Sequence, residues 1–184
     1  INIFLKRMLD VTLGLVGLLI GLPLFIIIAV FISFESSGPV LFQQIRLGRK
    51  MKPFTIYKFR SMVENAENME AGIFNVVNDS RITKVGNFLR NTSFDELPQL
   101  INIIKGDMSF VGPRPPVTYE LGDLNSLTPE FKSRFDMKPG VTGLAQVSGR
   151  NELSWDAKVG YDNRYIELFK KWGILIDIKL ILLT

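Results

Sequence analysis

Two adjacent carboxylates, Asp95 and Glu96, are the side chains of this sequence best suited to nucleophilic or acid–base chemistry. Apolar residues follow them at the spacing of one helical face: Leu97, Leu100, Ile101 and Ile104. Pro98 lacks a backbone donor and fits best in the first turn of a helix, which places the predicted helix start near Phe94 or Asp95. Unpaired amides and the helix dipole favour anions there, so an aspartate at such a position more often caps the helix than reacts.

A second candidate group is the guanidinium of Arg114, which stands between two prolines in the segment Gly112–Pro115. A guanidinium held in a rigid turn suits bidentate binding of a phosphate, although a solvated surface arginine is the more common case. Further along, residues 139–151 contain three glycines within ten positions. This composition predicts a loop whose backbone amides approach a phosphate or nucleotide closely, but the spacing matches neither the P-loop nor the dinucleotide fingerprint.

The composition narrows the chemistry further. The chain has 184 residues with no histidine and no cysteine, which excludes histidine bases, Ser–His triads, disulfides and the usual zinc sites. Nucleophilic or acid–base work must therefore fall to carboxylates, lysine, tyrosine, serine or threonine. A net charge of +4 favours phosphate-bearing partners. The basic residues are not interleaved with aromatics and form no zinc-finger, helix-turn-helix or RNP pattern, so we expect no nucleic-acid partner.

The N-terminal part contains a candidate membrane segment. Residues 11–34 carry no charge and would form a helix about 36 Å long, enough to cross a bilayer. The run is too long for a signal-peptide core, and no small-residue cleavage site follows it. Pro23 lies in its middle and predicts a kink. Basic residues flank both ends, which favours a helix that enters and leaves the membrane on one face; a tilted spanning helix that tolerates the proline is the alternative.

The remaining elements must position the candidate groups. Short strands are predicted at 40–42 and 54–59 around a basic hairpin loop at Ile45–Pro53, and helices at 63–71, 82–90 and 155–171. Asn91 and Thr92 are expected to end the second of these helices, and 74–83 to form a loop. The apolar segment 173–184 is predicted to be a helix at the membrane interface or, equally, a core helix. The fold class predicted is therefore α+β, mostly helical, with a short β hairpin.

Taken in order along the chain, these motifs resemble the signature of the bacterial sugar transferase family, the monotopic phosphoglycosyl transferases or polyprenyl-phosphate sugar phosphotransferases. The resemblance is carried by RITKVGNFLRNTSFDELPQLINIIKGDMSFVGPRP at Arg81–Pro115 and by the linked motifs KRMLD, YKFRSM, PGVTGLAQVSGRN, YD and DIK. It covers essentially the whole chain. Members of this family start the assembly of surface glycans and glycoproteins.

The resemblance implies a reaction and a set of site residues. It implies that Asp95 is the nucleophile that takes a phosphosugar from a UDP-sugar, releases UMP, and passes the phosphosugar to a polyprenyl (undecaprenyl) phosphate. Glu96 would assist catalysis, and Mg²⁺ is the expected cofactor, held by Asp95 and the diphosphate. No catalytic role is assigned to Asp177, because the segment before it is longer than is usual in the family. By motif position, the expected substrate-binding residues are Lys58, Arg90, Arg114, Arg150 and Asp162.

The resemblance also implies how the chain meets the membrane. Members are anchored by a re-entrant helix broken near a proline, so residues 1–36 are expected to form such a helix, kinked near Pro23. Residues 37–184 are then a compact catalytic domain with interfacial helices, on the cytoplasmic face of the bacterial inner membrane. Expected partners are the UDP-sugar, the lipid phosphate and membrane lipid, with a homodimer left open.

Two other functions stay open at this point. The first is another membrane enzyme, such as a phosphatase or nucleotidyltransferase, that uses the same dyad. The second is a non-catalytic membrane scaffold in which Asp95 only caps a helix. Because the chain begins with Ile1 and ends inside an apolar run, we also expect the natural protein to extend beyond one or both ends.

Overall fold

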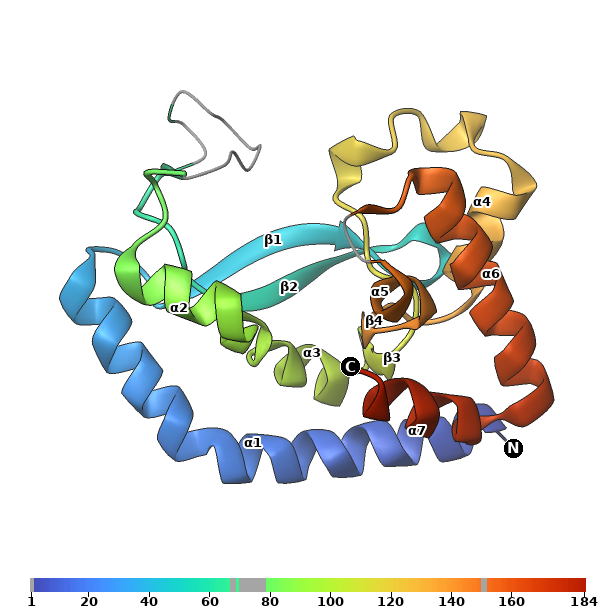
Figure 1. Cartoon of the computed structure of the whole chain (residues 1–184), viewed down its shortest axis with the longest axis horizontal. Helices are drawn as coiled ribbons and strands as arrows, with labels where there is room; N and C mark the ends of the chain where they lie inside the picture. Colours follow the sequence, from blue (N-terminus) through green and yellow to red (C-terminus); the bar gives the residue numbers. More distant parts are fainter. Residues whose placement is uncertain (1, 67–68, 70–78, 150–151) are drawn as a thin grey trace.

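One long helix runs beneath a domain of shorter helices and two small sheets (Figure 1). A computed structural model describes residues 2–66, 69, 79–149 and 152–184. Its elements, with η marking 3₁₀ helices, are α1 (Asn2–Glu35), β1 (Leu41–Leu47), η1 (Arg49–Met51), β2 (Pro53–Phe59), α2 (Lys84–Thr92), η3 (Phe94–Glu96), α3 (Gln99–Lys105), β3 (Ser109–Val111), η4 (Thr118–Glu120), η5 (Leu124–Ser126), α4 (Pro129–Ser133), η6 (Arg134–Asp136), β4 (Gly140–Thr142), α5 (Leu144–Ser148), α6 (Trp155–Trp172) and α7 (Ile174–Leu182). The predicted α+β class is confirmed.

The β hairpin forms where the sequence predicts it, with a longer first strand. β1 pairs antiparallel with β2, from Leu41 opposite Phe59 to Leu47 opposite Pro53. The residues Ile45–Leu47, predicted to lie in the loop, belong to β1. Their backbones continue the antiparallel pairing with β2, with Ile45 opposite Thr55 and Arg46 opposite Phe54. The connecting turn is correspondingly short.

The second sheet was not predicted. It consists of β3 and β4, which pair in parallel with Ser109 beside Gly140 and Val111 beside Thr142. The loop predicted at residues 139–151 is therefore wrong in its described part, because β4 and the short helix α5 occupy it. A Cβ atom on Gly140 would collide with the backbone nitrogen of Gly112, so a glycine is required where these strands approach.

The helices around the dyad differ from the prediction in detail. Asn91 and Thr92, predicted to end the helix before them, both belong to α2, which ends at Thr92. The Thr92 hydroxyl donates to the Phe88 carbonyl at 2.9 Å, so this polar side chain has a hydrogen-bond partner within the helix. The described part of the helix predicted at 63–71, residues 63–66, forms a turn; residues 67, 68, 70 and 71 lie outside the described residues. The helix predicted at 155–171 is confirmed as α6, and α7 follows it.

The helix α1 exposes nearly all of its apolar surface. In its most apolar 18-residue window the mean hydropathy is 3.0, yet only 11% of that window is buried, which excludes the core helix of a soluble domain. Pro23 lies inside it, where its missing N–H leaves the carbonyl of Leu19 without its helical donor. Figure 1 shows α1 bending between its two halves.

The first turns of α1 are fixed to the domain by buried polar contacts. The ammonium of Lys6 lies 2.6 Å from the carboxylate of Asp177 on α7 and donates to the carbonyl of Val111 at 2.9 Å. The carboxylate of Asp10 accepts bonds from the Ser109 hydroxyl and the Phe110 N–H in β3. Each buried charge of these first turns therefore has hydrogen-bond or ion-pair partners, which offset the cost of its burial.

The last turn of α1 is fixed to the same domain. The carboxylate of Glu35 accepts the N–H groups of Lys84 and Val85, at 2.7 and 2.9 Å, and so caps the start of α2. The guanidinium of Arg60, just after β2, donates to the carbonyl of Ser36 at 2.6 Å. Between these polar contacts, Ile28 and Ile32 of α1 pack with Phe59 and Leu89.

We predict that Lys6→Met lowers the free energy of unfolding by about 3 kcal/mol, because it leaves the Asp177 carboxylate buried without its cation. The double variant Lys6→Met/Asp177→Leu should recover most of that loss, since it removes both charges. Unfolding of the detergent-solubilised protein measures the effect, with the exposed Lys170→Met as the control. An equal loss in the single and double variants would contradict this account of the ion pair.

Candidate active site

The dyad lies in a 3₁₀ turn and not in the first turn of an α-helix as predicted. Asp95 and Glu96 belong to η3, and the N–H of Leu97 bonds to the carbonyl of Phe94 at 3.2 Å in the 3₁₀ pattern. Pro98 has no N–H to make the α-helical bond to Phe94, so α3 begins only after it. The tight turn presents both carboxylates toward the hairpin.

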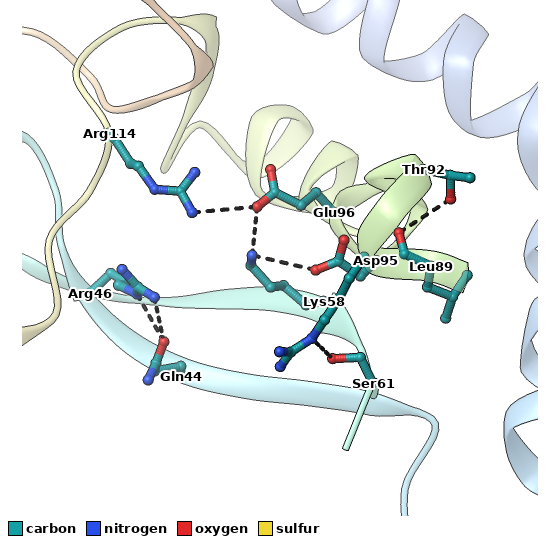
Figure 2. A network of polar contacts seen from close by, with 10 residues as sticks. Gln44, Arg46, Lys58, Ser61, Leu89, Thr92, Asp95, Glu96 and Arg114 are labelled. Carbon is teal, nitrogen blue, oxygen red and sulfur yellow. Dashed lines mark hydrogen bonds and ion pairs between the residues drawn. The ribbon is translucent and has the colours of Figure 1, made fainter. Parts of the chain in front are cut away.

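Lys58 of β2 meets both carboxylates, as Figure 2 shows. Its ammonium lies 2.6 Å from Glu96 Oε1 and 3.7 Å from Asp95 Oδ2. All three side chains are less than one-fifth exposed, so water screens their charges less than it would at the surface. The hairpin therefore supplies the counter-charge that allows two adjacent carboxylates to lie close together.

Two arginines lie on the Glu96 side of the dyad. The guanidinium of Arg114 is 3.6 Å from Glu96 Oε1, and its side chain is 49% exposed, which leaves it accessible to a ligand. The guanidinium of Arg46 on β1 is held by the side-chain oxygen of Gln44 and by the carbonyl of Pro115. Figure 2 shows both side chains on the same side of Lys58 and Glu96.

Arg90, in the last turn of α2, lies on the Asp95 side. Its Nε donates to the Ser61 hydroxyl at 2.8 Å, and its charge favours the ionised form of Asp95. One turn earlier, Gly86 packs so closely on the Ser61 backbone that any Cβ would collide with the carbonyl. This close contact brings α2, and with it Arg90, next to the end of β2.

The two carboxylates of the dyad have opposite pKa shifts. Burial raises the pKa of Asp95 above its ordinary value, and the neighbouring Glu96 adds to the rise, while Lys58 opposes it. Burial also acts to raise the pKa of Glu96, but the charges of Lys58 and Arg114 outweigh it and hold that pKa below its ordinary value. The same lysine thus lowers the pKa of both carboxylates, but it outweighs the effect of burial, with the help of Arg114, only at Glu96.

A cavity of about 550 Å³ opens beside the dyad. Its wall runs from Glu96 and the two arginines across β4 and α5 to the first half of α6. The residues that line it include Glu96, Arg114, Arg46, Thr142, Trp155 and Lys158. A cavity of this size is in the range that holds a small-molecule ligand.

Asp162 of α6 lies in the wall of this cavity, buried with Arg134 of η6. The Arg134 Nη2 atom is 2.8 Å from Asp162 Oδ2, and each side chain is 2% exposed. Burial raises the pKa of Asp162 to about 6, although the charge of Arg134 opposes the shift. At neutral pH the pair is thus mostly ionised.

The structure brings together most of the residues predicted for the site. Asp95, Glu96, Lys58 and Arg114 form one cluster, Arg90 lies at its edge, and Asp162 lies in the wall of the same cavity. Arg150 lies outside the described residues.

Two further arginines were missed by the sequence reasoning. Arg46 stands in the basic segment that was interpreted as a hairpin loop, and Arg134 has no motif of its own. The run of basic residues around Arg46 could have indicated a residue of the site, because a phosphate site needs several cations. Nothing in the sequence alone marks Arg134.

The carboxylates present suit a magnesium ion that arrives with a diphosphate. The described residues contain no group of three or more carboxylate, histidine or cysteine side chains that could hold a metal by themselves. Magnesium commonly takes one or two carboxylates and completes its shell with waters and phosphate oxygens. Lys58 lies closer to Glu96, at 2.6 Å, than to Asp95, at 3.7 Å, so Asp95 is the carboxylate that better fits this role.

The chain belongs to the bacterial sugar transferase family, which it matches over residues 1–184. The resemblance seen in the motifs is thereby confirmed. The chain is 43% identical over 197 residues to the galactosyl transferase CpsE of Streptococcus agalactiae, and the match covers 100% of the chain and 42% of that protein. It is 41% identical over 189 residues to the UDP-glucose:undecaprenyl-phosphate glucose-1-phosphate transferase of Escherichia coli, with 100% and 40% covered.

A shorter relative is covered more completely. The exopolysaccharide production protein ExoY of Sinorhizobium fredii is 36% identical over 193 residues, with 97% of the chain and 83% of that protein covered. The chain therefore spans about two-fifths of the length of the two longer relatives and most of ExoY.

We predict that Lys58→Met raises the pKa of both dyad carboxylates, because the lysine charge and its hydrogen bond lower each of them. The acid-side titration of Asp95 should then move to still higher pH. Carbon-13 chemical shifts of labelled carboxyl groups, followed against pH, measure the change. The exposed Lys50→Met on η1 is the matched control and should leave both titrations in place; unmoved titrations in Lys58→Met would refute the assigned coupling.

Proposed function

We propose that the chain is a phosphoglycosyl transferase that moves a sugar 1-phosphate from a UDP-sugar to a polyprenyl phosphate such as undecaprenyl phosphate. The observation that carries the proposal is the Asp95–Glu96 dyad, set among Lys58, Arg90 and Arg114 at the edge of a cavity. Family membership and the printed names of the relatives, which include a UDP-glucose:undecaprenyl-phosphate transferase and an exopolysaccharide production protein, support it. The reaction would be the first membrane step of a glycan or glycoconjugate.

The first half-reaction forms a covalent intermediate on Asp95. A carboxylate oxygen of Asp95 attacks the phosphorus that carries the sugar, and the bond from that phosphorus to the bridging oxygen breaks. UMP leaves with the bonding electrons, and the phosphosugar stays on Asp95 as an acyl phosphate. The attacking group is an anion, so no proton has to move, and the lack of histidine is no obstacle.

The second half-reaction regenerates the enzyme. A phosphate oxygen of the polyprenyl phosphate attacks the same phosphorus, and Asp95 leaves as a free carboxylate. The product is a polyprenyl diphosphate sugar. Each half-reaction is an in-line displacement at one phosphorus, so a single site serves both the donor and the acceptor.

The surrounding cations stabilise the charge that builds up during each displacement. Arg114 is half exposed and can bind a phosphate directly, while Lys58 lies between the two carboxylates. Glu96, kept anionic by Lys58 and Arg114, holds these two cations in place. A magnesium ion bound by Asp95 and the diphosphate would neutralise further phosphate charge. Arg150 remains a proposed nucleotide-binding residue by its motif position.

We further propose that α1 is a re-entrant membrane anchor with the domain on the cytoplasmic face of the bacterial inner membrane. Both ends of α1 are bonded to the same domain, through Lys6 and Asp10 at one end and Glu35 at the other. A straight helix that crosses the bilayer would carry one of these ends to the far side. The exposed apolar residues of α7, among them Leu175 and Leu182, fit an interfacial helix beside it. A homodimer remains an open arrangement.

We predict that Asp95→Asn folds normally and loses essentially all transfer. Asparagine keeps the volume of aspartate but cannot act as the anionic nucleophile. UMP release from a UDP-sugar in the presence of polyprenyl phosphate measures activity, and thermal unfolding checks the fold. Mass spectrometry of the wild-type protein should find a phosphosugar adduct on Asp95.

Other outcomes of this experiment identify the alternatives. Release of inorganic phosphate or diphosphate in place of UMP would indicate a phosphatase or a nucleotidyltransferase. A fully active Asp95→Asn variant would show that Asp95 is not the nucleophile. A wild-type protein that binds no nucleotide and releases none would favour the membrane scaffold.

The anchor proposal predicts the same accessibility for both ends of α1. Since the chain has no cysteine, single cysteines placed at Asn2 and at Ser37 can be labelled one at a time in intact cells with a membrane-impermeant reagent. Both should be protected in intact cells and react after the membrane is opened. Reaction of one of the two in intact cells would indicate a spanning helix.

A further inference from the structure

The segment Val111–Pro116, which carries Arg114, is held along its whole length by its carbonyl groups. Three of its residues are prolines, Pro113, Pro115 and Pro116, and these have no N–H to donate. Each of its six carbonyls accepts at least one hydrogen bond, and the donors come from α1, β1, η6, β4, α5 and α6. They are Lys6 and Tyr165 to Val111, Gln146 to Gly112 at 3.5 Å, the Gly140 N–H to Pro113, Arg134 to Arg114, Arg46 to Pro115, and the Leu47 N–H to Pro116.

Arg134 provides the contact at Arg114 itself. Its Nη2 atom donates to the Arg114 carbonyl oxygen at 2.9 Å and forms an ion pair with Asp162 Oδ2 at 2.8 Å, so one nitrogen contacts both groups. The guanidinium carbon lies within 5.3 to 5.6 Å of the ring centres of Phe131, Phe135 and Trp155. These rings and the carboxylate leave Arg134 little freedom to move.

This arrangement is poorly explained by stability alone. A buried ion pair is often no more stabilising than a well-packed apolar pair of the same size. Among the residues that the structure describes, the Nε and Nη1 atoms of Arg134 are buried without hydrogen-bond partners, which adds a cost. Arg134 lines the cavity, but its side chain is only 2% exposed and presents far less surface to a ligand than the 49% exposed side chain of Arg114.

We infer that Arg134, held by Asp162, is a positioning residue that fixes the backbone of Arg114 so that its guanidinium meets the substrate diphosphate. This inference rests on the proposed function and adds a role for two residues of the cavity wall. The guanidinium of Arg114 is half exposed and lies 3.6 Å from Glu96, so its position depends strongly on where its own backbone is held. Displacements of about 1 Å at such groups are enough to weaken binding or catalysis severely.

Binding of UDP, with magnesium chloride present, tests the inference without any transfer reaction. Arg134→Lys keeps a positive charge beside Asp162 but lacks the planar fork of arginine. We expect UDP to bind this variant roughly tenfold more weakly, the size of one charge-assisted hydrogen bond. In an Arg114→Ala background the same change should cause no further loss, because Arg134 acts through Arg114. Arg114→Lys replaces Arg114→Ala as the background if alanine removes all measurable binding.

Two further variants complete the design. Arg49→Lys is the matched control, because Arg49 also donates to a backbone carbonyl, that of Asp136, but lies on the exposed η1 turn. It should bind UDP as the wild type does. Asp162→Asn keeps the side-chain volume and removes the charge that holds Arg134, so it should weaken UDP binding in the same direction and again not in the Arg114→Ala background. It also provides the test if Arg134→Lys does not fold.

The outcomes separate this inference from the proposed function. Losses that add in the double variants, or unchanged UDP binding in both Arg134→Lys and Asp162→Asn, would overturn the positioning role. So would a wild-type protein whose UDP binding does not depend on Arg114. A protein that shows the expected coupling but transfers no phosphosugar would overturn the proposed function and support the positioning role.

Discussion

The structure depends on how the charges of one apolar helix are neutralised. Lys6 and Asp10 are almost fully buried, and each finds its partner in the domain and not in α1 itself. Leaving either unpaired would cost several kcal/mol, so the first turns of α1 have one favourable position, against β3 and α7. Glu35 fixes the other end by capping α2. Since α2 leads directly into the dyad turn, the position of the anchor and that of Asp95 are set by the same contacts.

The site itself separates two carboxylates that differ little in sequence position. Asp95 and Glu96 are neighbours on a turn of three residues, yet their pKa values shift in opposite directions. Burial and the charge of Glu96 raise the pKa of Asp95, while at Glu96 the charges of Lys58, 2.6 Å away, and Arg114 outweigh burial. Glu96, the carboxylate closer to Lys58, has its pKa held below the ordinary value and forms ion pairs with Lys58 and Arg114. The other keeps a less stabilised negative charge, which is the property that a nucleophile requires.

The sequence was enough to predict which side chains lie together around Asp95, and less so for the elements that hold them. Asp95, Glu96, Lys58 and Arg114 could be predicted because they stand in linked motifs, and the hairpin and α6 because apolar periodicity extends over enough residues. The pairing of β3 with β4 could not, since three-residue strands have no measurable periodicity and their partners are about 30 positions apart. The start of the helix at the dyad was predicted too early. Pro98 has no N–H to donate to the carbonyl of Phe94, so α3 begins only after it. The sequence shows that this N–H is missing, but not which carbonyl it would have bonded. The partner of Asp177 is Lys6, a contact between residues 171 positions apart that no local pattern indicates.

That same separation sets the order in which the protein can be completed during synthesis. α1 is made first, but Asp177 enters the chain 171 residues after Lys6. At roughly 5 to 20 residues per second, Lys6 waits about 10 to 35 seconds for its counter-ion. During this time the first turns of α1 lack the contact that joins them to α7. Closure of the Lys6–Asp177 contact is thus a late event, which joins the apolar helix to a domain whose last helix has just been made.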